Sequence, residues 1–206
     1  MCSSDLVDGA GYLTNLDDGN VEHLPFESAV VDPQISPDAQ FVAFVADGAV
    51  HLWVLATGEV RRLSPVDGAH VTWGLADFIA AEEFGRHRGL WWLADSTGVI
   101  AQRVDASAVR EIWLSDPAQP ESPPTPHRYP AAGTQNAEVS LHLIGVDGET
   151  APLAWDVEAC CYLIDVHVAS ETDVLVTTMS RDQRHRRTYE LRDGILAEIE
   201  IGRAHV

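Results

Sequence analysis

The chain has 206 residues, of which 46% are hydrophobic, and this is enough apolar material for a packed core. It carries 32 acidic and 13 basic residues, a net charge of −19, which excludes nucleic acid as a partner because phosphate binding needs a basic surface. No apolar run approaches the roughly 18 residues of a membrane-spanning helix, so the sequence contains no membrane segment.

Both ends of the chain have an unusual sequence. The opening MCSSDL and the closing EIGRAHV resemble peptides translated from common sequencing-adapter DNA. We therefore interpret residues 1–6 and 200–206 as artefacts, to be set aside as one sets aside a tag, and residues 7–199 as the folded domain.

The first strongly patterned segment predicts three short β-strands. FVAFV at 41–45 and VHLWVL at 50–55 are apolar and rich in β-branched and aromatic residues, and Asp47-Gly48 between them is typical of a tight hairpin turn. Thr57-Gly58 then predicts a turn into a further strand in EVRRLS.

The segment Trp73–Gly89 predicts a helix that carries an unusual pair of acidic residues. Apolar residues recur at helical spacing at Leu75, Phe78 and Ile79. The next positions on that face are Glu82 and Glu83. Burying two neighbouring carboxylates is costly unless a cation meets them, because each loses its hydration and the two repel each other.

Two explanations for Glu82 and Glu83 are open from the residues alone. Arg86 lies four residues after Glu82, at the spacing of a helical ion pair, and Arg88 could act similarly if the helix ended and the chain turned back. Such internal pairing is commonplace, and on the residues alone it is the more ordinary explanation. The alternative is a cation that comes from outside the chain.

The remaining sequence repeats the multi-strand pattern. LADSTGVIAQRVD with REIWLSDP begins at Leu93, and ASETDVLVTTMSRDQ with RTYELRDG begins at Ala169. A recurring unit of several antiparallel strands predicts an all-β fold, a partial β-propeller with about three to four blades, rather than the rival β-sandwich. Between the copies, Asp116–Pro130 is too rich in proline for a central strand and is expected at the surface or along a blade edge.

Several further residues have simple structural interpretations. Trp91 and Trp92 should face opposite sides of a strand and fill space between neighbouring blades. The basic cluster SRDQRHRR at 180–187 reads as a solvated hairpin tip. The cysteines do not form a disulfide framework, and no convincing metal site is found; the nearest constellation is Cys160 and Cys161 with His167.

Four segments occur together in a specific order: TWGLADFIAAEEFGRHRGLWW, VDASAV, RYPAAGTQNAEVSL and SRDQ. In this combination, about residues 32–194 resemble the β-propeller (N-terminal) domain of dipeptidyl peptidase IV-like enzymes, in the prolyl oligopeptidase family of serine peptidases. Tyr129, Pro130 and Asn136 belong to the third segment and are interpreted as shaping a loop rather than binding a ligand.

The resemblance implies a function for the glutamate pair. In this family an eight-bladed propeller is joined to an α/β-hydrolase domain, and two glutamates of the propeller hold the free α-ammonium of the substrate. Cleavage then removes an N-terminal dipeptide that ends in proline or alanine. The corresponding residues here are Glu82 and Glu83, with Arg86 as a candidate for orienting the pair.

The catalytic chemistry is expected outside this chain. No G-x-S-x-G nucleophile elbow occurs in the sequence, so the chain is expected to be inactive alone, with no catalytic residue, metal or cofactor. The implied partners are a peptide with a free N-terminus, the C-terminal α/β-hydrolase domain of the parent protein, and a second copy in a homodimer. The family's upstream substrate-contacting arginine has no counterpart here. The alternative function is a stand-alone propeller that acts as a protein-binding scaffold.

Overall fold

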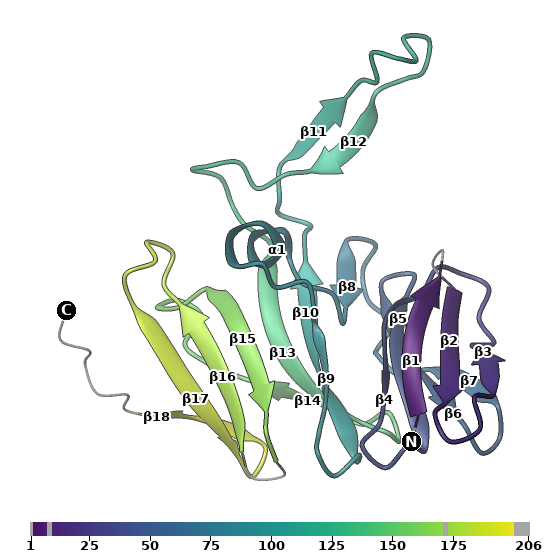
Figure 1. Ribbon diagram of the computed structural model, residues 1–206. Coiled ribbons are helices and arrows are strands. Elements are labelled where there is room, and N and C mark those ends of the chain that lie inside the picture. The colour runs from purple at the N-terminus through teal and green to yellow at the C-terminus, as the bar shows by residue number, and fades with distance from the viewer. Residues whose placement is uncertain (1, 8–9, 171–172, 200–206) are drawn as a thin grey trace.

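The computed structural model describes residues 2–7, 10–170 and 173–199 and shows an all-β chain with one short helix (Figure 1). The described strands form four antiparallel sheets that stand side by side, together with a separate two-stranded hairpin. Three of the four sheets contain four or five strands and the remaining one contains three. The predicted partial β-propeller of three to four blades is confirmed.

The first two sheets are simple meanders. The first contains, in order, β1 (Cys2–Val7), β2 (Ala10–Asn15) and β3 (Val21–His23). The second contains, in order, β4 (Val31–Ile35), β5 (Phe41–Ala46), β6 (Ala49–Val54) and β7 (Glu59–Arg62). Asp47 and Gly48 join β5 to β6 with positive φ angles of 50° and 69°, which confirms the predicted hairpin turn.

The third sheet has an interrupted edge strand. Its members are β8 (Val71–Trp73), β9 (Leu90–Trp92), β10 (Gly98–Asp105), β13 (Glu138–Gly145) and β14 (Thr150–Leu153). Both β8 and β9 pair with the same side of β10, where Trp73 lies opposite Arg103 and Leu90 lies opposite Ala101. The chain between them leaves the sheet and forms helix α1 (Phe78–Phe84).

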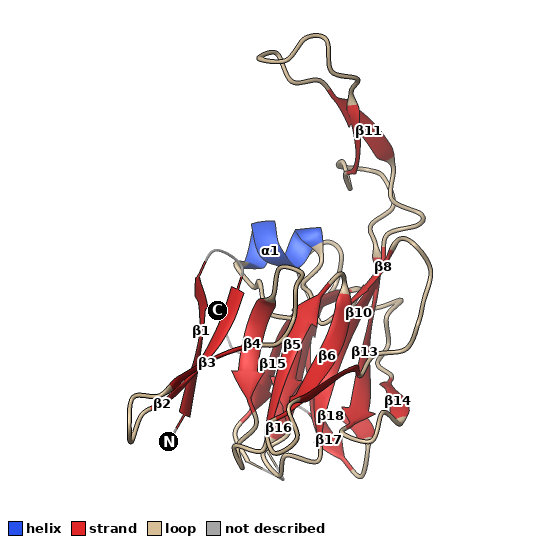
Figure 2. Cartoon of the chain, turned by 90° about the vertical axis from the view of Figure 1, so that its right-hand side faces the viewer, coloured by secondary structure: helices blue, strands red, loops and turns tan. Residues whose placement is uncertain are grey.

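The last sheet and the hairpin complete the described chain. The fourth sheet contains, in order, β15 (Tyr162–Val168), β16 (Val174–Met179), β17 (Arg186–Arg192) and β18 (Ile195–Ile199). The hairpin of β11 (Glu111–Leu114) and β12 (Thr125–Arg128) lies between β10 and β13 in the sequence. It extends away from the sheets, on the side of the molecule that carries α1 (Figures 1 and 2), and we call it the arm.

Neighbouring sheets pack face to face, and this packing explains the continuous apolar strand FVAFV. In β5, Val42 and Phe44 pack toward the first sheet, whereas Ala43 and Val45 pack toward the third. A strand that is buried on both faces cannot alternate apolar with polar residues. Each fully buried large apolar side chain of this kind stabilises the fold by about 1.5–3 kcal/mol. A further cluster fills the space between the third and fourth sheets.

Two sequence expectations differ from the structure. The helix predicted over Trp73–Gly89 is limited to Phe78–Phe84, because Asp77 caps its start and Gly85 ends it in a left-handed conformation. The segment Glu111–Leu114, expected as a blade strand, instead pairs only with Thr125–Arg128 in the arm. The proline-rich segment lies in this two-stranded ribbon and its tip, which agrees with its exclusion from a central strand.

The two ends of the chain differ in how far the structure describes them. Residues 2–6 lie within β1, whereas residues 200–206, interpreted from the sequence as an artefact, lie outside the described residues. Within the described part of the chain the single helix has 7 residues, and no helix there is long and apolar enough to cross a membrane.

Candidate functional site

Helix α1 is short and is defined by its two caps. The Asp77 carboxylate accepts hydrogen bonds through Oδ2 from the backbone N–H groups of Ile79 and Ala80, at 3.1 and 3.3 Å. At the other end, Gly85 adopts a φ of 64° and the backbone N–H of Arg86 donates to the Ala80 carbonyl at 3.0 Å. These bonds satisfy polar backbone groups that a helix of 7 residues would otherwise leave unpaired.

Glu82 and Glu83 lie in the last turn of α1 and both are exposed. Among the described residues, neither side chain takes part in an ion pair or a hydrogen bond. The last turn contains no basic residue. Carboxylates are unfavourable at this end of a helix because the exposed carbonyl groups carry partial negative charge. The pair therefore has a local cost that the described chain does not offset.

Arg86 does not neutralise either glutamate. Its guanidinium is buried and donates from Nη1 to the Arg88 carbonyl oxygen at 2.5 Å and to Gln102 Oε1 at 2.7 Å. Nη2 donates to the Leu163 carbonyl oxygen at 3.0 Å and lies 3.8 Å from Asp77 Oδ1. Burial lowers the pKa of Arg86, although the charge of Asp77 opposes this.

Arg88 is also engaged elsewhere. Its guanidinium makes two hydrogen bonds of 3.0 Å to the Asp32 carboxylate, which lies in β4 of the second sheet. The internal ion pairs that the spacing to Glu82 and Glu83 offered are therefore not formed. Both arginines instead fix the segment after α1 to the sheets around it.

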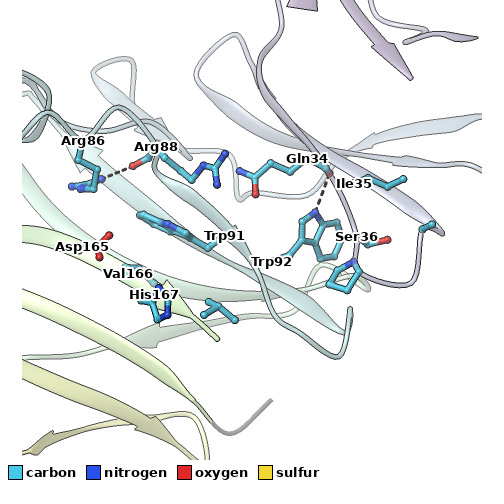
Figure 3. A pocket seen from close by; sticks show the side chains of 13 residues that line it. Gln34, Ile35, Ser36, Arg86, Arg88, Trp91, Trp92, Asp165, Val166 and His167 are labelled. Atoms are coloured by element: carbon cyan, nitrogen blue, oxygen red, sulfur yellow. Dashed lines mark hydrogen bonds between the residues drawn. The ribbon is translucent and has the colours of Figure 1, made fainter. Parts of the chain in front are cut away.

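A cavity of about 670 Å³ lies where β4, β9 and β15 come together (Figure 3). Its walls carry the polar side chains of Gln34, Arg86, Arg88, Asp165 and His167. Arg86, two residues beyond α1, lines this cavity, whereas Glu82 and Glu83 do not.

Trp91 and Trp92 form part of the apolar wall of the cavity and are buried. Trp91 packs in the cluster between the third and fourth sheets, and Trp92 packs in the cluster between the second and third. The Trp92 indole N–H donates to the Gln34 carbonyl oxygen at 3.0 Å (Figure 3). The expectation that the two tryptophans face opposite sides and fill space between blades is confirmed.

The other residues that the sequence singled out have contacts or burial consistent with structural roles. Tyr129 contacts the Phe78 ring edge to face, with centroids 5.2 Å apart. Asn136 donates to the Tyr162 hydroxyl at 3.3 Å, and Tyr162 in turn contacts Phe84 at the end of α1. Cys160 and Cys161 are free thiols, and burial raises the pKa of Cys161. Among the described residues no group of His, Cys, Asp or Glu side chains could hold a metal ion.

Sequence reasoning missed two residues next to α1, Asp77 and Gln102. Gln102 Nε2 donates to Asp77 Oδ1 at 3.1 Å, and both side chains are buried. Asp77 directly before an apolar helical run is an N-cap signal, and Gln102 is a polar residue within the apolar run GVIAQRV. A buried polar side chain needs hydrogen-bond partners, so a glutamine within an apolar strand was the feature of the sequence that could have indicated this contact.

Comparison with known proteins places the chain in a family. Residues 6–199 match the model of the dipeptidyl peptidase IV N-terminal region. Dipeptidyl-aminopeptidase B of Aspergillus niger is 32% identical over 125 residues, which cover 54% of this chain and 14% of that protein. Human dipeptidyl peptidase 8 is 28% identical over 138 residues, covering 58% of this chain and 15% of that protein.

Comparison with solved structures agrees with this match. The crystal structure of Porphyromonas gingivalis dipeptidyl peptidase 4 has a TM-score of 0.83 and 26% identity, and the match covers 96% of this chain and 30% of that protein. The chain therefore spans less than a third of the length of these relatives, which are named as peptidases. The chain belongs to the family of dipeptidyl peptidase IV N-terminal regions.

Proposed function

We propose that this chain is the substrate-recognition propeller of a dipeptidyl peptidase IV-like serine exopeptidase, in which Glu82 and Glu83 bind the free α-ammonium of a peptide. The observation that carries the proposal is the state of these two carboxylates: they are adjacent, exposed and without an ion pair among the described residues. Arg86 and Arg88, the nearest arginines in the sequence, bind other groups.

An α-ammonium suits this pair chemically. It is a compact cation with three N–H donors, and two carboxylates can accept from it through charge-assisted hydrogen bonds. An internal residue of a longer peptide has no such charge. Binding at Glu82 and Glu83 would therefore measure the substrate from its free N-terminus, and it would hold the bond after the second residue at a fixed distance from the pair.

Cleavage of that bond belongs to a separate α/β-hydrolase domain of the parent protein, since this sequence contains no G-x-S-x-G motif. The expected products are N-terminal dipeptides of the Xaa-Pro or Xaa-Ala type. Arg86 supports the glutamate pair without binding the substrate. Its bonds to Gln102 and to the Leu163 carbonyl fix the segment that leaves α1. The chain alone would bind such a peptide without hydrolysing it.

We also propose that the parent protein forms a homodimer through the arm. Trp113 and Leu114 in β11 are 63% and 51% exposed, although both are large and apolar. The arm extends from the sheets (Figure 1), so its apolar side chains are accessible to a second copy.

The test is kinetic and uses the full-length parent enzyme. Glu82→Gln or Glu83→Gln should lower kcat/KM for a dipeptidyl substrate with a free amine by at least about tenfold, because one charged partner of the ammonium is lost. Glu59→Gln, at an exposed position in β7, is the matched control and should leave kcat/KM unchanged. An N-acetylated substrate should be poor for the wild type and insensitive to all three variants.

Two results would count against the proposal. Equal losses for the free and the acetylated substrate would mean that the glutamates support folding rather than amine binding. A full-length protein with no peptidase activity would favour the alternative function, a stand-alone propeller that binds other proteins as a scaffold.

A further inference from the structure

Gln102 lies where the edge strand of the third sheet is interrupted. Trp73 in β8 pairs with Arg103, and Leu90 in β9 pairs with Ala101, so Gln102 is the β10 residue between the two pairing stretches. It faces the gap through which the chain leaves the sheet to form α1. Its exposed fraction is 0%, so its side chain has no contact with bulk solvent.

The backbone of Gln102 is hydrogen-bonded to the chain on both sides of the inserted segment that contains α1. The N–H of Gly74 donates to the Gln102 carbonyl oxygen at 2.8 Å, and the N–H of Gln102 donates to the Gly89 carbonyl oxygen at 2.8 Å. The outgoing and returning limbs come so close that a Cβ on Gly89 would lie 2.5 Å from the Leu75 carbonyl carbon. One residue of β10 therefore holds both limbs.

The side chain of Gln102 reaches both ends of the helix. Nε2 donates to Asp77 Oδ1 at 3.1 Å, while the other oxygen of that carboxylate caps the start of α1. Oε1 accepts from Arg86 Nη1 at 2.7 Å, and Arg86 follows the Gly85 that ends α1. The amide thus connects the cap residue before the helix with the arginine after it.

The side-chain amide of Gln102 can make both of these bonds at neutral pH, because it has a donor nitrogen and an acceptor oxygen. The group must donate to a carboxylate and accept from a guanidinium at the same time, which an ionised carboxylate or a thioether cannot do. In a fully buried site, each lost bond leaves a charged group without that partner, and this costs more than at the surface.

We propose that Gln102 is a positioning residue for the ammonium-binding pair Glu82 and Glu83, and this inference rests on the proposed function. An isolated helix of 7 residues is not stable in water, so the direction of α1 is set by its anchors. Gln102 ties together the two anchors, Asp77 and Arg86. It fixes where the carboxylates of the last turn lie without contacting the substrate.

The test compares two substrates in the full-length parent enzyme. The measured quantity is the ratio of kcat/KM for a free-amino dipeptidyl substrate to kcat/KM for its N-acetylated form. Gln102→Met, which keeps the shape of the side chain and removes both hydrogen bonds, should lower this ratio by about tenfold, because the pair no longer meets the ammonium in register. A purely structural role would lower both values together and leave the ratio unchanged.

Matched variants separate the causes. Val176→Ala, which shortens a buried side chain in the fourth sheet by two carbon atoms, should reduce stability without changing the ratio. Adding Gln102→Met to the Glu82→Gln, Glu83→Gln double variant should lower the ratio no further, since positioning matters only while the carboxylates are present.

Each outcome decides the matter. An unchanged ratio in Gln102→Met, with a lowered ratio in Glu82→Gln, overturns the positioning role and leaves the proposed function standing. An unchanged ratio in both variants overturns the proposed function and, with it, the positioning role. If Gln102→Met does not fold, Gln102→Asn keeps an uncharged amide but shortens its reach by one methylene group, and it is judged by the same two comparisons.

Discussion

Arg86 donates from Nη2 to the carbonyl oxygen of Leu163 at 3.0 Å, and this bond joins the segment after α1 to β15 of the neighbouring sheet. The same guanidinium binds Gln102 and the Arg88 carbonyl and lies over the Trp91 ring, 5.7 Å from its centroid. A single buried cation therefore connects the helix that carries the candidate site with two blades.

Arg86→Met is expected to destabilise the chain strongly. Removing the guanidinium leaves the buried Asp77 carboxylate without its cation and Gln102 Oε1 without its donor, and breaking a buried charged network in this way typically costs about 3 kcal/mol. Urea denaturation should show a lower midpoint for Arg86→Met. Arg192→Met is the control, because its pair with Glu190 is exposed. Equal midpoints for the two variants would contradict the role given to Arg86.

Stability is expected to fall as the pH is lowered below about 6.5, the ordinary pKa of histidine. Burial lowers the pKa of both His51 and His142 in the folded chain. His51 packs against Phe26 and Phe44, and His142 packs against Trp73, so both rings favour the neutral form. Well above pH 6.5 both histidines are neutral in the folded and in the unfolded chain. Below this pH they bind protons in the unfolded chain first, so the folded chain loses stability.

The check is the urea midpoint at pH 7.5 and pH 5.5. The histidines should dominate this window, because the pKa of Asp67 is lowered to about 2 by its hydrogen bond with Arg103 and its loss of stability lies at lower pH. The double variant His51→Phe, His142→Phe should show a smaller difference between the two midpoints. A difference as large as that of the wild type would show that other groups cause the acid sensitivity.

Trp113→Glu should convert the proposed homodimer of the parent protein into a monomer. The substitution places a charge on the exposed apolar surface of the arm, where association would have to desolvate it. Sedimentation velocity gives the oligomeric state directly. Ile195→Glu is the matched control, because Ile195 is 69% exposed on β18, away from the arm. A dimer that persists in Trp113→Glu and dissociates in Ile195→Glu would move the interface to the fourth sheet.

The sequence predicts much of the fold because the blade pattern is local. The apolar runs at β5 and β6 and the Asp47-Gly48 turn define a hairpin within a few residues of one another. The arm is different: Glu111–Leu114 has the composition of a blade strand, and only its pairing with Thr125–Arg128 takes it out of the blade. Pairing partners are set by tertiary structure, which composition does not encode.

The candidate site also has one part that the sequence indicates and one part that only the structure shows. Glu82 and Glu83 stand out in the sequence because two carboxylates follow an apolar helical stripe. The bonds of Arg86 could not be foreseen, because its partners Gln102 and Leu163 lie 16 and 77 residues away. Spacing along a helix suggested Glu82 as its partner, but the helix ends at Phe84 and Arg86 turns inward.

The most direct measurement of the central claim is the affinity of the full-length parent protein for a dipeptide with and without its charged amine. Isothermal titration calorimetry should show that an Xaa-Pro dipeptide binds at least about tenfold more tightly than its N-acetylated form, and that Glu82→Gln with Glu83→Gln abolishes the difference. Equal affinities of the wild type for the two dipeptides would contradict ammonium recognition by Glu82 and Glu83.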